Sequence, residues 1–330
     1  MPAISVVIPT HGGAGRLPET LAALDTAPAP PGGAEVIVVD DGSPEPIPRQ
    51  LAVGRAHPVR ILRHEPNRGR AFAANRGIEA ASGRVILVLD DDMSLAPAAL
   101  AGHLAAHPEG ADPSAVVGRI VPSEAHFTGR FGRFLAAEEE RRRRRLLAAT
   151  DDVPFEACLT GHFSAPRETL LAVGGYDERF DRYGFEDIDL AWRLARAGVR
   201  LRYRDDLSAV HRSEHAASFD VHCRRHREAG RMAVRFAAGR DDPELERVLR
   251  VRSGRPAGRP TPYRVVIATS QALVRTLPGP LRDGLLALAR LKVRAWEWVA
   301  PDRLLHAGYH VVRDMHYAAG IADERAARRG

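Results

Sequence analysis

The sequence predicts an α/β fold in which a mostly parallel sheet is flanked by helices and followed by a helical C-terminal appendage. Over roughly the N-terminal third, short apolar β-branched runs alternate with helical segments, which is the pattern of a parallel sheet. After residue 215 the composition changes to long basic helical segments. The 330 residues, 45% of them hydrophobic, suffice for one large domain and an appendage.

Each element of the predicted sheet follows from a local pattern. Four apolar runs have the length and β-branched content of buried parallel strands: 4–8, 35–39, 59–62 and 85–89. Helices are expected at 17–24 and 68–81, with Asn67 as a candidate N-cap of the second helix. Strands that alternate with helices predict right-handed crossovers between parallel neighbours.

Three adjacent carboxylates, Asp90, Asp91 and Asp92, follow the fourth apolar run. Ligands of open α/β sheets bind outside the carboxyl ends of the strands, and two carboxylates one residue apart there suit a hard divalent cation. The alternative interpretation is an acidic turn that caps a following helix, with Asp92 or Ser94 as N-cap. Because another strand also ends in carboxylates, we expect two carboxylate sets to face one crevice.

Five motifs in order give the chain a family resemblance. They are SVVIPT (5–10), VIVVDDGS (36–43), NRGRAFAANRGIEAASG (67–83), LDDD (89–92) and GGYDERFDRYGFEDIDLAWRLARAG (174–198). The chain resembles the family 2 glycosyltransferases, whose nucleotide-sugar-binding fold is called GT-A. The resemblance implies a Rossmann-like GT-A catalytic domain over 1–215, with a donor-binding part (1–95) and an acceptor part (96–215). Residues 216–330 would form the helical region, with a linker near 252–262.

The resemblance also implies which residues hold the sugar donor. Asp40 is expected to accept a hydrogen bond from the nucleobase, while Asp41 is interpreted as mainly structural through the turn that follows it. Arg70 is interpreted as either a phosphate contact or a solvated side chain. The further donor-binding positions are Pro9, Thr10, His11, Asn67, Gly69, Asn75, Asp90 and Asp91.

A divalent cation, Mn²⁺ or Mg²⁺, is the cofactor that the resemblance implies. Asp92 would bind the metal directly, Asp90 would meet the metal's waters or the ribose, and His211 would be a third ligand or a phosphate contact. The metal would neutralise charge on the departing nucleoside diphosphate. A lone histidine such as His211 is otherwise a surface or core residue, here following an expected edge strand at 199–203.

The segment GFEDIDLAWRLARAG predicts an amphipathic helix that begins at Glu186 and ends at Gly198. Acidic residues in its first turn also favour the helix dipole, which is the alternative interpretation. The resemblance implies inverting transfer with Asp187 as general base and Glu186 bound to sugar or acceptor hydroxyls, although spacing alone does not distinguish the two carboxylates. The implied acceptor and sugar pocket comprises Gly161, His162, Phe163 and Gly175.

The remaining patterns concern partners and location. EEERRRRR (138–145) predicts an exposed charged helix with Glu138–Arg142 pairing, or else a patch for a lipid diphosphate or an anionic bilayer. Basic helices with tryptophan are expected at 263–277, 281–298 and 304–319, after a first basic helix at 216–238. Their apolar faces would pack on the protein or lie in a membrane interface.

Composition excludes several classes of protein. Cys158 and Cys223 are far apart and have no zinc-ligand spacing, so neither a disulfide scaffold nor a zinc site is expected. No apolar run reaches the ~18 residues of a transmembrane helix, and no signal peptide is expected. The net charge of +6 favours acidic partners such as nucleotide diphosphates, but no nucleic-acid-binding motif is present.

The resemblance implies an enzyme of bacterial cell-envelope glycan or glycoconjugate synthesis, which is expected in the cytoplasm or, as the alternative, peripherally on the inner membrane face. The expected donor is a UDP-, GDP- or dTDP-sugar, and the expected acceptor is a glycan, a lipid-linked glycan or a small molecule. A non-catalytic module that binds sugar nucleotides or glycans is the alternative. A nucleotidyltransferase is disfavoured because residues 10–20 contain no lysine.

Overall fold

The computed structural model describes residues 1–123, 127–180, 184–212, 218–238 and 262–329, together with positions 240, 242 and 245. The chain forms two compact units. The first comprises Met1–Ala125, Ala137–Asp181 and Glu186–Ser213, and the second comprises His126–Ala136, Arg182–Phe185 and Glu214–Gly330. Two short segments expected in the catalytic domain, 126–136 and 182–185, thus group with the C-terminal helices. The linker expected near 252–262 lies almost entirely outside the described residues.

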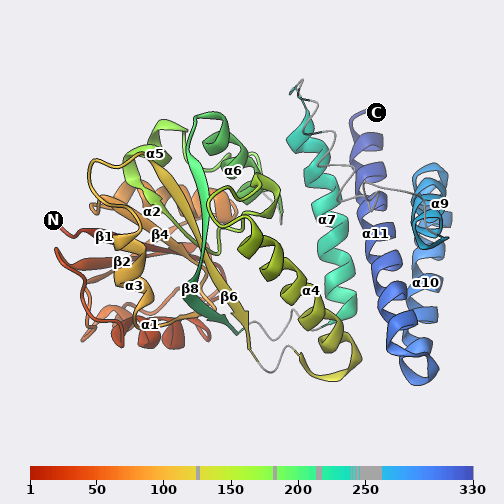
Figure 1. Ribbon diagram of the computed structural model, residues 1–330, viewed down its shortest axis with the longest axis horizontal. Coiled ribbons are helices and arrows are strands. Elements are labelled where there is room, and N and C mark those ends of the chain that lie inside the picture. The colour runs from red at the N-terminus through yellow and green to blue at the C-terminus, as the bar shows by residue number, and fades with distance from the viewer. Residues whose placement is uncertain are drawn as a thin grey trace. The chain divides into compact units, whose positions relative to one another are not determined.

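An eight-stranded sheet forms the centre of the first unit (Figure 1). Its strands are β1 (Ile4–Thr10), β2 (Ala34–Asp41), β3 (Val59–His64), β4 (Val85–Leu89), β5 (Met93–Leu95), β6 (Ser114–Pro122), β7 (His162–Pro166) and β8 (Arg200–His211). The strand order is β3-β2-β1-β4-β7-β6-β8-β5. Strands β1, β2 and β4 are buried along their whole length, which is why their sequences are apolar on both faces.

The helices of this unit connect the strands. They are α1 (Leu17–Asp25), α2 (Arg70–Ala80), α3 (Ala99–Ala105), the C-terminal part of α4 (Gly129–Ala148), α5 (Arg167–Ala172) and α6 (Glu186–Arg196), with 3₁₀ turns η1 (Arg49–Ala52) and η3 (Phe155–Ala157). Leu17, Leu21 and Leu24 of α1 pack into the core beside the apolar residues of β1, β2 and β4. Apolar residues at this helical spacing place one face of α1 on the sheet.

The strand order creates a topological switch point between β1 and β4. The chain passes from β1 outward to β2 and β3 and then returns to the other side of β1 to form β4. All three pairings among these four strands are parallel, so the carboxyl ends of β1, β2 and β4 lie on one edge of the sheet. A crevice at this edge is where sheets of this kind bind ligands.

The sheet is mostly parallel, as the sequence predicts, and it also contains antiparallel pairings. Of its strand pairings, β4–β7, β5–β8 and β6–β7 are antiparallel, and the other four are parallel. The expected edge strand at 199–203 is the first part of a longer strand, β8, which extends to His211. The three-residue strand β5 pairs only with residues 209–211 of β8, so among the described strands residues 200–203 have β6 as their one strand neighbour.

Two expected helix caps are absent because tertiary pairing uses the same residues differently. Ser94 lies in β5 and pairs with Val210 of β8, and the next helix begins only at Ala99, so neither Asp92 nor Ser94 is an N-cap. Asn67 is not the N-cap of α2, which is Gly69 with φ of 96°. A glycine is suited to this left-handed backbone conformation.

The arginine run of α4 is largely neutralised by neighbouring carboxylates. Its ion pairs are Glu138–Arg141, Glu139–Arg142 and Glu140–Arg144, while Arg143 reaches Asp205 at 2.7 Å. Two of these pairs have i,i+3 spacing, and Arg142 pairs with Glu139 instead of the expected Glu138. The charged surface of α4 is therefore mainly self-compensated.

The second unit is helical. Its long helices are α7 (Phe219–Ala237), α9 (Pro262–Thr276), α10 (Gly279–Val299) and α11 (Asp302–Ala327), and α11 packs against the other three (Figure 1). Phe131, Phe134, Phe219 and Tyr309 form an aromatic cluster within its core. Among the described residues, none of the helices combines the length and apolar character needed to cross a bilayer.

Candidate active site

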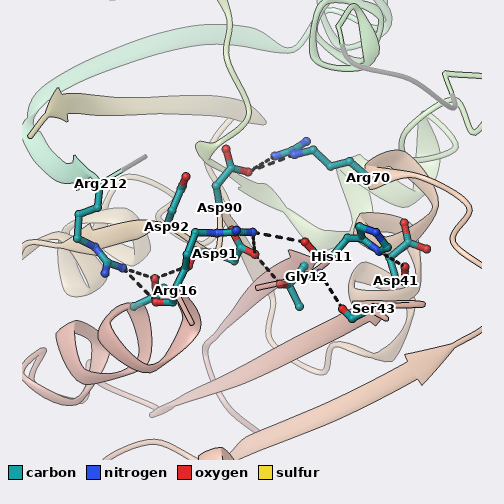
Figure 2. A network of polar contacts seen from close by, with 12 residues as sticks. His11, Gly12, Arg16, Asp41, Ser43, Arg70, Asp90, Asp91, Asp92 and Arg212 are labelled. Atoms are coloured by element: carbon teal, nitrogen blue, oxygen red, sulfur yellow. Dashed lines mark hydrogen bonds and ion pairs between the residues drawn. The ribbon is translucent and has the colours of Figure 1, made fainter. Parts of the chain in front are cut away.

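The loops that follow β1 and β2 are joined at the crevice. His11 Nδ1 lies 2.8 Å from the carbonyl oxygen of Asp41, and Gly12 N donates to Ser43 Oγ at 2.9 Å (Figure 2). His11 is exposed, whereas Pro9 and Thr10 before it are buried. Among the donor-binding residues predicted at the end of β1, His11 is therefore the one whose side chain reaches the surface of the crevice.

Asp91 is the buried member of the three carboxylates. It accepts hydrogen bonds from Thr10 Oγ1 at 2.5 Å and from Arg16 Nη2 at 2.9 Å (Figure 2). Its backbone oxygen also accepts a bond from Thr20 Oγ1 at 2.7 Å. Burial raises the pKa of Asp91, and the bonds from Arg16 and Thr10 counteract that rise. The contacts of Asp91 therefore join the end of β4 to β1 and α1.

Asp90 turns the other way, toward α2. Arg70 Nη2 donates to Asp90 Oδ1 at 2.8 Å, and Arg70 also bonds the Thr160 backbone oxygen at 3.1 Å (Figure 2). The Asp90 side chain is 35% exposed. The neighbouring position 161 requires a glycine, because a Cβ at Gly161 would lie only 2.4 Å from Asp90 Oδ2. Arg70 thus carries a positive charge at the crevice beside a carboxylate that remains accessible.

Asp92 and His211 form the pair best suited to a divalent cation. Asp92 Oδ2 lies 3.2 Å from His211 Nε2, and the two side chains are 15% and 25% exposed. Burial tends to raise the pKa of Asp92, but the bond and charge of His211 outweigh it and lower that pKa below its usual value. An ionised carboxylate and an imidazole nitrogen at this distance fit Mn²⁺ or Mg²⁺.

The metal site would have to be completed by the ligand. Within the described part of the chain, three or more histidine, cysteine or acidic side chains do not gather in a cluster able to hold a metal. Asp92 and His211 would supply two protein ligands, and Asp90 lies on the same short turn with its carboxylate accessible. Diphosphate oxygens and water commonly fill the remaining positions around Mg²⁺.

Glu186 and Asp187 open α6 and have contrasting surroundings. Glu186 is 9% exposed, and its Oε2 atom is buried without a hydrogen-bond partner. Burial, then the negative charge of Asp187, raises the pKa of Glu186 to about 7, against the opposing charge of Arg70. Asp187 is half-buried, and its Oδ1 accepts a bond from Ile188 N at 2.8 Å. Near neutral pH, Glu186 is therefore poised between its acid and carboxylate forms.

Replacing Glu186 by glutamine is expected to stabilise the fold at pH 8 and to change its stability far less at pH 5. A folded-state pKa of about 7, above the ordinary 4.5, means that ionising Glu186 disfavours the folded state. Stability is then greatest below pH 4.5 and is lost as the pH rises through 7. The variant should gain up to about 3 kcal/mol in free energy of unfolding at pH 8.

Urea unfolding at both pH values measures this gain. The exposed Glu168→Gln variant is the matched control, since it removes the same charge from the surface. Equal stability changes at pH 5 and pH 8 would contradict the burial argument for Glu186.

The two acidic residues after β2 are both used within the protein. Asp40 is fully buried, and its oxygens accept bonds from Ser43 N at 2.9 Å, Ile47 N at 3.1 Å and Arg63 Nη1 at 2.5 Å. These bonds shape the turn after β2 and oppose the effect of burial, so that the pKa of Asp40 is lowered. Neither oxygen of Asp40 is turned toward solvent, so its expected contact with a nucleobase remains a prediction.

Asp41 orients the start of α2. Its two oxygens accept bonds from Arg68 N and Gly69 N, each at 2.8 Å. Asn67 is exposed, and its Oδ1 accepts a second, longer bond from Gly69 N at 3.1 Å. A carboxylate on backbone amides at a helix N-terminus is favoured by the helix dipole, so the interpretation of Asp41 as structural agrees with these contacts.

Asn75 links α2 to the segment before α6 instead of facing an open site. Its Oδ1 accepts a bond from Tyr176 N at 2.7 Å, and its Nδ2 donates to Tyr176 O at 2.9 Å and to Glu178 at 3.0 Å. Gly175 has φ of 63°, and a Cβ there would lie 2.4 Å from Asn75 Oδ1. Both residues thus position the turn at 175–178, which is a structural role that the sequence did not separate from donor or acceptor binding.

His162 and Phe163 do not line an open pocket, because both are fully buried in β7. His162 Nδ1 faces the Arg119 backbone oxygen at 3.4 Å, and its Nε2 lies 2.8 Å from His103 Nε2. A carbonyl can only accept, so His103 donates to His162, and Ser164 Oγ then donates to His103 Nδ1 at 2.8 Å. Burial lowers the pKa of His162 to about 4, which keeps this buried chain neutral.

Sequence reasoning missed three arginines at the crevice. Arg16 pairs with Asp91, Arg63 pairs with Asp40, and Arg212 donates to Thr20 Oγ1 at 2.6 Å. Each arginine is distant in sequence from its partner, so no spacing rule could have paired them. The one local signal was position, since Arg212 directly follows His211.

Two protein families match parts of this chain. Residues 5–169 match the family described as glycosyl transferase family 2, and residues 144–217 match the N-terminal domain of galactosyltransferase. A pre-mycofactocin glycosyltransferase of Mycobacterium tuberculosis is 30% identical over 217 residues, covering 63% of this chain and 42% of that protein. A validoxylamine A glucosyltransferase of Streptomyces hygroscopicus is 28% identical, covering 66% and 54%. The chain thus spans about half the length of these relatives.

Solved structures agree on the fold. A mannosyltransferase from Pyrobaculum calidifontis, in complex with GDP-Man and Mn²⁺, superposes with a TM-score of 0.62 at 20% identity over 95% of this chain and 86% of that chain. The Staphylococcus aureus protein TarS (1–349), in complex with UDP-GlcNAc, gives 0.51 at 16% identity over 100% and 92%. At these identities the likeness establishes the shared α/β fold, which is the GT-A fold.

Proposed function

The chain belongs to glycosyltransferase family 2, and from this premise we propose that it transfers a sugar from a nucleoside-diphosphate sugar to an acceptor hydroxyl with inversion. One observation carries the proposal: the accessible Asp90 carboxylate and the Asp92–His211 pair lie at the carboxyl end of β4, beside the switch point. The names of two neighbours in fold include GDP-Man with Mn²⁺ and UDP-GlcNAc, which supports a nucleotide-sugar donor.

The donor diphosphate would lie over the carboxyl ends of β1 and β4. Asp92 and His211, with Asp90, would hold Mn²⁺ or Mg²⁺, which supplies Lewis-acid stabilisation of the leaving diphosphate. Arg70 carries a further positive charge at the same place, and its guanidinium already spans Asp90 and Thr160. Positive charge fixed in advance where negative charge develops lowers the barrier to departure of the nucleoside diphosphate.

Asp187 is proposed as the general base and Glu186 as the residue that binds a hydroxyl. Asp187 is the less buried of the two carboxylates, whereas burial, then the charge of Asp187, raises the pKa of Glu186 to about 7. An ionised, half-buried carboxylate can take the proton of the attacking hydroxyl. The buried, unpartnered Oε2 of Glu186 would then pair with a hydroxyl of the sugar or acceptor.

The biological setting is part of the same proposal. We propose a role in bacterial cell-envelope glycan or glycoconjugate synthesis, at the cytoplasmic face of the inner membrane. The acceptor would be a glycan, a lipid-linked glycan or a small molecule carrying a free hydroxyl. Nucleic acid is not proposed as a partner, since no binding motif for it occurs in the sequence.

The proposal is tested by donor hydrolysis and binding across a panel of UDP-, GDP- and dTDP-sugars, with Mn²⁺ or with EDTA. One donor is expected to be turned over in Mn²⁺ and to be spared in EDTA. Binding of a donor without turnover would support the non-catalytic module instead. Absence of binding to every donor, with and without metal, would contradict the proposed donor site.

A further inference from the structure

The second unit exposes most of the large apolar side chains on the described surface. Of fourteen such residues, nine lie between Val265 and Leu304, on α9, α10 and the start of α11. They are Val265, Val266, Leu273, Leu281, Leu288, Leu291, Trp298, Val299 and Leu304. Scattered exposed leucines need no explanation, but this concentration in forty residues indicates an interaction surface.

On α10 the exposed residues form a continuous stripe along one side of the helix. The outward stripe consists of Leu281, Gly284, Leu288, Leu291, Ala295 and Trp298, all exposed. Their spacing alternates between three and four residues, which places them on one face over the length of the helix. Leu288 is 66% exposed and Trp298 is 89% exposed.

The opposite side of α10 is the one that packs inside the unit. Leu286 and Val293 are buried against residues of α11, and Trp296 is partly buried on the same side. The apolar content of the outward stripe is therefore not needed for the internal packing of α10. A helix that is apolar on two opposite faces is expected to bury its second apolar face against another partner.

The charge around the outward stripe is positive. Residues 265–304 contain six arginine or lysine residues and three acidic residues, which gives a net charge of +3. The three acidic residues are already engaged within the unit: Asp283 with Arg227, Glu297 with the Tyr309 hydroxyl and Asp302 with Arg130. Arg282, Arg290 and Arg294 are likewise engaged, with Asp323 or Asp220. Lys292 and Arg303 are exposed, and their charge indicates a partner that carries negative charge.

We infer that the outward stripe, with the exposed residues of α9, binds the surface of an anionic phospholipid bilayer. Leucines on one face, cations beside them and a tryptophan at one end match a helix lying in the bilayer interface. This membrane surface rests on the proposed function, in which the acceptor can be linked to a lipid. It adds to that proposal by identifying which surface of the chain would meet the membrane.

A second copy of the chain is the competing occupant, because three-four spacing also suits a helix pair. The positions next to the stripe argue against it, since they are Leu285, Ala287, Lys292, Arg294 and Val299 and include no acidic residue. Helix pairs are specified by opposite charges at such flanking positions. Arg294 already pairs with Asp220, and a second copy would offer Lys292 no carboxylate at these positions, whereas an anionic bilayer offers phosphates.

Co-sedimentation of the full chain with vesicles tests the inference. The wild type is expected to bind phosphatidylglycerol–phosphatidylcholine vesicles, and to bind vesicles of phosphatidylcholine alone at least about tenfold more weakly. The triple variant Leu288→Gln, Leu291→Gln, Trp298→Gln should lose at least about tenfold in partitioning. High salt should weaken binding of the wild type, because exposed charges are screened.

The matched control replaces exposed apolar residues of the first unit in the variant Val53→Gln, Leu147→Gln, Leu171→Gln. It should bind vesicles like the wild type, and circular dichroism should show that both triple variants remain folded. Equal vesicle binding by the two triple variants would overturn the inference. So would a wild-type dimer that the α10 variant converts to monomer while vesicles bind neither protein.

Donor hydrolysis measured without vesicles separates this inference from the proposed function. The α10 variant should hydrolyse a donor at the wild-type rate, because none of its three positions belongs to the active site. If the wild type hydrolyses a donor but does not bind vesicles, the membrane surface is contradicted and the transferase proposal is not. If it binds vesicles but turns over no donor, the transferase proposal is contradicted and the membrane surface is not.

Discussion

Replacing Asp92 by asparagine is expected to lower metal-dependent donor turnover by about a thousandfold. The substitution keeps the size of the side chain but removes the negative charge that lies 3.2 Å from His211. Without that charge, the pair would hold Mn²⁺ more weakly and would stabilise the leaving diphosphate less. The measurement is donor hydrolysis over a range of Mn²⁺ concentrations, which separates weaker metal binding from slower chemistry at saturation.

The control for this variant is Asp112→Asn, which removes the same charge from a side chain that is 89% exposed. It should hydrolyse the donor at the wild-type rate. Turnover by Asp92→Asn that matches the wild type at every Mn²⁺ concentration would show that Asp92 is not a metal ligand. Calorimetric titration of Mn²⁺ gives a readout independent of turnover.

Replacing Asp187 by asparagine is expected to reduce kcat by about a thousandfold and to leave the KM for the donor near its wild-type value. The substitution removes the proposed base but no group assigned to the diphosphate or its metal. Glu186→Gln should have a smaller effect on kcat, because an amide can still bond a hydroxyl. Initial rates with the donor identified by the panel, at saturating acceptor, measure both variants.

The opposite ranking is equally informative. If Glu186→Gln abolished transfer and Asp187→Asn retained most of it, the base would be Glu186, whose pKa of about 7 would then control the rate. The pH profile distinguishes the cases, since a rate that rises through pH 7 in the wild type should lose that rise in Glu186→Gln only if ionised Glu186 is required.

The triplet Asp90–Asp92 illustrates how a buried strand can end in three carboxylates. Asp90 pairs with Arg70 and Asp91 pairs with Arg16 (Figure 2). Asp92 lies beside His211, so each negative charge has its own positive or protonatable neighbour. Adjacent like charges would otherwise destabilise the end of β4. Asp91 is the most enclosed of the three, with a side chain that is 11% exposed against 15% for Asp92 and 35% for Asp90, so Asp90 is the most accessible to a ligand.

The sequence alone determined the elements and the order in which they reach the crevice. Apolar, β-branched runs such as 85–89 form strands because a parallel strand buried on both faces requires such residues, and the motifs at their ends carry the family resemblance. Asp92, Glu186 and Asp187 stand in motifs of the family resemblance and His211 follows them, so the sequence was enough to propose these four as site residues. Amphipathic periodicity likewise predicted the helices of the second unit.

Only the tertiary structure decided which side chains are available. Asp40 was expected at the nucleobase, yet Arg63 and the turn amides enclose its carboxylate. His162 lies in the core because β7 pairs with β4 and directs the ring toward α3. Strand register and long-range ion pairs depend on the folded chain as a whole, because their partners are distant in sequence. They decide which polar groups are buried and which remain accessible to a ligand.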